Sequence, residues 1–163
     1  MNAADAIRNT LNVADMVMRA YLEDLTDSEL MMRPHSGCNH IKWQLGHLIA
    51  SENQLNSAVY PDAMPPLPDG FADRYSKEAA ASDDASAFDS KEVLFATYEA
   101  QRAATLAILE KAPPEDLDRP SPEQLQGYAP TAGAVLNLHG QHHLMHCGQW
   151  VIVRRMLGKP IVI

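Results

Sequence analysis

Four segments with apolar residues three or four positions apart, separated by proline-marked links, constrain the fold of this chain most strongly. In the first segment, residues 3–25, successive apolar or small residues follow at steps of 4, 3, 4, 3 and 4: Ile7, Leu11, Ala14, Met18, Tyr21 and Leu25. This spacing places them on one face of a helix. Similar stripes follow over residues 40–59, 90–112 and 131–157. We therefore expect an all-α protein whose four helices share one apolar core.

The links between these segments are rich in proline. The segment YPDAMPPLPDG, within residues 60–89, holds four of the eleven prolines, and we expect an irregular loop there with a short helix near 76–81. A second proline-marked link covers residues 113–130. The residues alone leave open whether these links join antiparallel neighbours or cross over. A chain of 163 residues without an internal repeat predicts a single domain, residues 1–163.

Composition argues against several classes of protein. The chain has 13 lysines and arginines against 21 aspartates and glutamates, and this acidic balance argues against a nucleic-acid binder. No stretch approaches eighteen apolar residues and the N-terminus has no long apolar region, so we expect neither a membrane span nor a secretory signal. Two cysteines, Cys38 and Cys147, are too few for a disulfide framework. We expect a cytoplasmic protein.

Histidine is the unusual residue of this chain. Four of the seven histidines fall in the run LHGQHHLMHCGQW. On a helix, His142 and His146 lie one turn apart on one face, and His139 and His143 form a second such pair. Burying several imidazoles without partners is costly, whereas neutral imidazole binds divalent ions well. We interpret this run as part of a metal site.

A further ligand has to come from another segment. His47, in the middle of the second helix and flanked by leucines, is the best placed. His40 lies on the same face seven residues earlier, and His35 and Glu52 are weaker alternatives. Three protein ligands leave a coordination position open, which is typical of catalytic rather than structural zinc sites.

Two segments resemble the DinB/YfiT-like family. RPHSGCNHIKWQLGHLIASE is similar to the family's Arg-Pro, loop and helix bearing a Trp and a Gly-His, and HGQHHLMHCGQWVIVRRMLGKP is similar to its last helix. The resemblance is strongest over residues 24–59 and 130–160. It implies an up-down four-helix bundle with a three-histidine divalent metal site.

In the register of this resemblance, the metal ligands are His47, His142 and His146. His139 and His143 are neighbours that could replace a predicted ligand. Zinc or nickel is expected rather than magnesium, because imidazole suits these ions. Some family members are thiol-dependent transferases or isomerases, and many members are dimers. The expected function is therefore a metal-dependent enzyme, either a transferase that uses a small thiol or a hydrolase. The alternative is a metal-binding stress or interaction protein without turnover.

Further expectations concern the last helix. It is apolar around most of its circumference, through Val135, Leu138, Leu144, Val151 and Ile152. Such a helix is either central in its own bundle or buried against a partner, and we expect a homodimer. We also expect Cys147 to pack against another helix and Gln149 to orient a ligand or a bound group.

Overall fold

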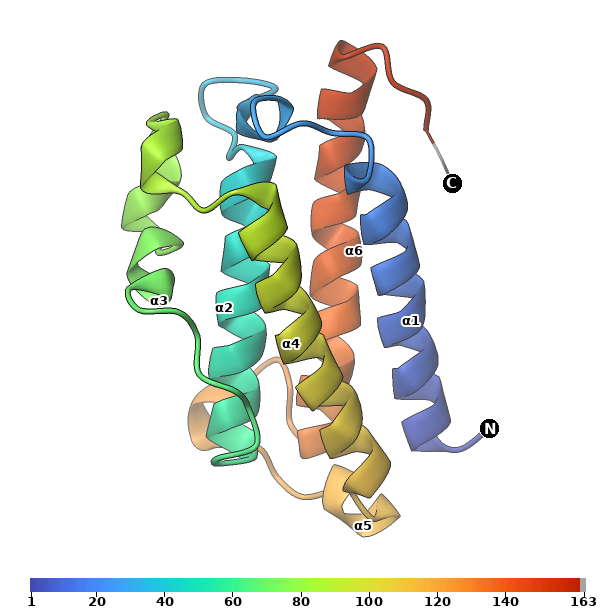
Figure 1. Ribbon diagram of the computed structural model, residues 1–163. Coiled ribbons are helices and arrows are strands. Elements are labelled where there is room, and N and C mark those ends of the chain that lie inside the picture. The colour runs from blue at the N-terminus through green and yellow to red at the C-terminus, as the bar shows by residue number, and fades with distance from the viewer. Residues whose placement is uncertain (162–163) are drawn as a thin grey trace.

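The four long helices predicted from the sequence form and lie side by side (Figure 1). In the computed structural model, which describes residues 1–161, they are α1 (Ala3–Leu22), α2 (Ile41–Val59), α4 (Lys91–Lys111) and α6 (Ala132–Met156). Over these residues there is no strand, only one isolated bridge between Pro120 and Thr131. The all-α prediction is confirmed.

The long helices do not alternate strictly in direction. Contacts between α2 and α4 advance together along both helices, from Asn53 with Gln101 to Asn56 with Thr105, so these helices run parallel. α1 and α6 also run parallel to each other, in the opposite direction (Figure 1). The alternation implied by an up-down bundle is therefore wrong between α2 and α4. The physical reason is the long link over residues 60–90, which returns the chain to the other end of the bundle.

This crossover link, residues 60–90, follows the outer side of α2 (Figure 1). It contains α3 (Phe71–Arg74) and the 3-10 turns Glu78–Ala81 and Ala85–Ala87, the first of which matches the short helix expected near 76–81. Tyr75 packs directly on α2 at Gly46, where any Cβ would overlap its ring. The link is thereby held against the part of α2 that carries His47.

Shorter elements close the ends of the molecule. A 3-10 turn, Glu29–Met31, lies between α1 and α2. Residues 112–131 contain α5 (Pro114–Leu117) and the 3-10 turn Glu123–Leu125, and they join α4 to α6. None of the helices in the described part of the chain has the length and apolar character needed to cross a membrane.

α6 is covered largely by its own chain. Its buried residues Cys147, Trp150 and Val153 join a core cluster to which α1, α2, α4 and the crossover link all contribute. Four of the five residues that motivated the dimer are buried or half-buried: Val135, Leu138, Leu144 and Val151. Ile152 remains 51% exposed. The breadth of the apolar surface of α6 therefore reflects mainly its central place in the monomer.

Candidate metal centre

Three histidines from two helices converge on one point. His47 of α2 and His142 and His146 of α6 each offer a ring nitrogen, and these atoms lie within 4.8 Å of one another. The Nε2 atoms of His142 and His146 are 3.2 Å apart. No other group of three His, Cys, Asp or Glu residues within positions 1–161 has this arrangement. The structure thus brings together the three residues selected from the sequence.

Trp43 positions the His47 ring. The two side chains lie one turn apart on α2, and their rings stack with centroids 4.9 Å apart and planes 7° from parallel. The indole Nε1 of Trp43 donates a hydrogen bond to the Ser76 carbonyl of the crossover link, at 2.9 Å. Because the indole is held at both its face and its edge, the orientation of His47 is restricted.

A buried glutamine, Gln44, determines the tautomer of His146. Its Oε1 is 2.9 Å from the indole Nε1 of Trp150, which can only donate, and its Nε2 donates to the Asn39 carbonyl at 2.7 Å. Oε1 is therefore an acceptor, and His146 Nδ1, at 2.7 Å from it, has to be the donor. In the neutral ring this leaves the lone pair on Nε2, which faces the cluster.

The sequence pattern favoured Gln149, and not Gln44, as the residue that orients a ligand. Gln149 is exposed, because position 149 lies on the solvent side of α6. Gln44 lies three residues before His47, which places the two side chains one turn apart on α2. This spacing was a usable signal, but only the approach of α6 shows that the amide reaches His146.

The cluster histidines are neutral at pH 7. Burial lowers the pKa of His142 and of His146 to about 4, and each is lowered further by neighbouring histidines. Burial also lowers the pKa of His47, with a further contribution from the positive charge of Lys77. Three neutral imidazoles are the donor set that borderline divalent ions prefer, so these residues fit a bound metal.

The second histidine pair of α6 belongs to a different polar cluster. His139 Nε2 lies 2.7 Å from Asn56 Oδ1, and His143 Nε2 lies 3.7 Å from the Glu52 carboxylate. Glu52 itself pairs with Arg102 at 3.0 Å and accepts from Thr105, and both of its oxygens are engaged in this way. Neither His139 nor His143 belongs to the three-histidine cluster.

The other alternative ligands also have local partners. His40 is the N-cap residue of α2, and its Nδ1 accepts from the Trp43 backbone N–H at 3.0 Å. His35 Nδ1 accepts from the Gly37 backbone N–H in the exposed loop. Cys147 is buried, and burial raises its thiol pKa to about 12, in keeping with a packing residue.

Two clefts open beside the cluster. The α6 cleft, about 650 Å³, lies between α2, α6 and residues 124–128, and His142 lines it. The link cleft, about 550 Å³, lies between α2 and the crossover link, and His47 lines it. Ser51 and Gln54 border both clefts, so the two meet along one face of α2.

Comparison with known protein families gives one match, to the DinB superfamily over residues 10–150. The chain belongs to the DinB superfamily. The matched region contains all three cluster histidines, both tryptophans and Gln44. Comparisons with curated proteins and with solved structures gave no match.

Proposed function

We propose that this member of the DinB superfamily is a divalent-metal-dependent enzyme whose metal ligands are His47, His142 and His146. The observation that carries the proposal is the convergence of three neutral imidazoles within 4.8 Å, one of them with its tautomer set by Gln44. Zinc or nickel is the ion we propose, because imidazole donors suit both. When bound, such an ion would act as a Lewis acid and would lower the pKa of a water or thiol attached to it.

The open side of the cluster favours an enzyme over a purely metal-binding protein. In the described part of the chain, no carboxylate or cysteine completes a four-residue group around the three histidines. Structural zinc sites are closed by four protein ligands, whereas catalytic sites keep one position for a reactant. A stress or interaction protein without turnover remains the alternative that the experiment below tests.

The two clefts favour group transfer over hydrolysis. Each cleft is lined by a different cluster histidine, His142 in the α6 cleft and His47 in the link cleft. A transferase has to hold two organic groups at one centre, whereas a hydrolase needs one organic substrate and water. We therefore propose a transferase that uses a low-molecular-weight thiol, with hydrolysis as the second candidate.

We also propose a cytoplasmic homodimer. Both cysteines, Cys38 and Cys147, are free thiols, which fits a reducing compartment. Ile152 and Met156 lie one turn apart on α6 and are each 51% exposed, and a second copy of the chain could cover them. A light-scattering mass near twice 18 kDa would support the dimer, and a mass near 18 kDa would refute it.

Elemental analysis followed by a substrate screen tests the proposed function. The purified protein should contain one zinc or nickel per chain, and small thiols should be screened with a panel of electrophiles. The His142→Ala variant is the matched control and should lose both metal and turnover. Absence of metal would overturn the site, whereas stoichiometric metal without turnover on the whole panel would favour the non-catalytic alternative.

A further inference from the structure

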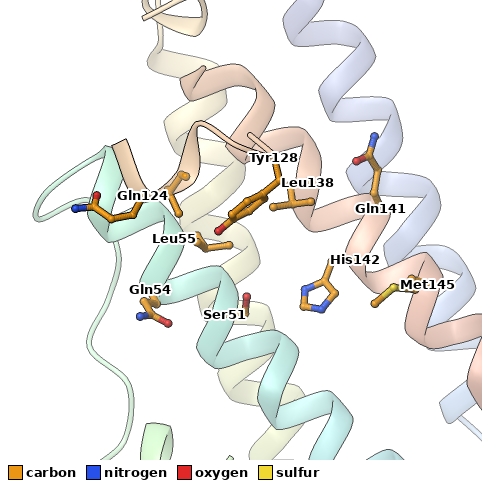
Figure 2. Close-up of a pocket in the computed structure, with 10 residues that line it drawn as sticks. Ser51, Gln54, Leu55, Gln124, Tyr128, Leu138, Gln141, His142 and Met145 are labelled. Carbon is orange, nitrogen blue, oxygen red and sulfur yellow. The ribbon is translucent and has the colours of Figure 1, made fainter. Parts of the chain in front are cut away.

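The α6 cleft continues the two helical faces that carry the cluster. The residues of these faces follow at four-residue steps: His47, Ser51 and Leu55 on α2, and His146, His142 and Leu138 on α6. The two helices run antiparallel, since Gln44 contacts His146 whereas Asn56, farther along α2, contacts His139, which comes earlier on α6. Ser51 thus lies across from His142, and Leu55 lies across from Leu138 (Figure 2).

The opposite side of the cluster is closed by aromatic side chains. Trp43 stacks on His47 and is 4% exposed, and Trp150, one turn beyond His146, is fully buried. A molecule cannot approach from that side without displacing the core. The donor atom of a bound molecule therefore has to enter from the side of Ser51, where the two clefts meet.

The walls of the α6 cleft carry no charged side chain. Its apolar residues come from three segments: Leu55, Leu125, Tyr128, Leu138 and Met145. Its polar residues are all neutral side chains: Ser51, Gln54, Gln124, Gln141 and His142. The link cleft differs, because Lys77 lines it.

Two large side chains at the α6 cleft have much apolar surface still in contact with water. Tyr128 is 59% exposed and Met145 is 56% exposed. Figure 2 shows the Tyr128 ring reaching from the 124–128 segment toward α2, opposite the His142 ring. Covering this surface with an apolar group is favourable, whereas a charged group would lose hydration there without gaining a partner.

We infer that the α6 cleft receives an uncharged aryl or alkyl group of the substrate, attached to the part of the molecule that reacts at the cluster. The inference rests on the proposed function, since it needs a metal at the three histidines to anchor the reacting end. It adds the chemical class of one reactant, an apolar one, and assigns Tyr128 and Leu138 as the residues that select it.

Two thiols that differ only in charge at the far end test this inference. The protein is loaded with Co²⁺, and the dissociation constants of benzyl mercaptan and 4-(mercaptomethyl)benzoate are measured from the visible spectrum of the bound ion. Benzyl mercaptan should bind at least about tenfold more tightly, which corresponds to about 1.4 kcal/mol. The readout is binding, so it needs no knowledge of the natural reaction.

A charge introduced into the cleft should reverse the preference. In Tyr128→Lys, the new ammonium group would partner the carboxylate, so 4-(mercaptomethyl)benzoate should become the tighter ligand. Gln149→Lys adds the same charge at an exposed position of α6 outside the cleft lining and is the matched control. That variant should keep the preference for benzyl mercaptan.

The possible failures are distinguishable. Equal affinities in the wild type, or a preference unchanged by Tyr128→Lys, would overturn the inference and leave the metal site standing. A preference that responds to Lys77→Met but not to Tyr128→Lys would show that the aryl group lies in the link cleft, and would also overturn it. Failure to bind Co²⁺ at all would overturn the proposed function and this inference with it.

Discussion

The two histidine pairs of α6 share one helix and one spacing, yet they lie in different surroundings. His142 and His146 point toward α2 and meet His47 at the mouth of two clefts. His139 and His143 come three positions before His142 and His146, respectively. They are each 1% exposed and lie beside Asn56 and the Glu52–Arg102 ion pair. One pair thus faces a space that a ligand can reach, and the other faces the interior of the bundle.

Accessible lone pairs, rather than histidine spacing, distinguish the proposed metal site from the polar core cluster. At 100° per residue, positions three apart on α6 differ by about 60° in direction, so both pairs approach α2 while one pair lies beside the clefts and the other lies in the interior. In the buried pair, His139 Nε2 is engaged by Asn56, and His143 lies beside the Glu52–Arg102 ion pair, whose guanidinium repels a cation. His142 lines a cleft, and Gln44 directs the Nε2 lone pair of His146 into the three-histidine cluster.

The largest expected effect is on metal binding, which should depend on His142 but not on His139. His142→Ala should abolish stoichiometric metal, because the two remaining imidazoles do not hold the ion by themselves. His139→Ala should retain one metal per chain. Elemental analysis after dialysis measures this, with helical circular dichroism as the control for folding. If His139→Ala lost the metal and His142→Ala kept it, the site would be the 139/143 pair.

The buried Glu52–Arg102 ion pair should affect the free energy of unfolding. Glu52→Leu leaves the Arg102 guanidinium, whose side chain is only 6% exposed, without its partner, and should lower the free energy of unfolding by about 3–5 kcal/mol. Urea denaturation measures the loss. The double variant Glu52→Leu/Arg102→Leu is the matched control and should recover most of it, since no uncompensated charge remains. A loss as large in the double variant would show that the ion pair is not the cause.

Gln44 should act on metal affinity rather than on stoichiometry. Gln44→Leu removes the acceptor of His146 Nδ1–H and should weaken metal binding about 10–100-fold, as expected when the partner of a ligand histidine is lost. Competition with a chelator gives the dissociation constant. Gln44→Glu keeps an acceptor at this position and should retain or increase the affinity. Equal weakening in both variants would indicate a packing role.

The smallest effect, counted for one histidine over one pH unit, concerns acidification. Burial lowers the pKa of His40 and of His139 to about 4 in the folded protein, from 6.5 for an exposed imidazole. Between these values the unfolded chain binds protons that the folded protein does not, so stability falls as pH falls. Each histidine contributes about 1.4 kcal/mol per pH unit.

Urea denaturation of the metal-free protein at several pH values measures this slope. His40→Asn retains a good N-cap residue and removes one titrating ring, so it should reduce the slope by about 1.4 kcal/mol per pH unit. A slope equal to that of the wild type would mean that His40 becomes protonated without unfolding.

Much of the fold was determined by local features of the sequence. The three-and-four spacing that begins at Ile7 predicts α1, which ends at Leu22. Pro113 and Pro114 follow the C-cap residue of α4, Ala112. The pairing of His142 with His146 also follows from helix geometry alone. These features are local, because backbone dihedrals and side-chain directions along one helix depend on neighbours within a few turns.

The tertiary structure decided what depends on how helices meet. No spacing in the chain shows that α2 and α4 run parallel, that Gln44 rather than Gln149 reaches His146, or that His143 turns toward Glu52. These outcomes depend on the rotation of α6 about its own axis and on the path of the crossover link. Both are set by the packing of the whole core, in which residues about a hundred positions apart come into contact.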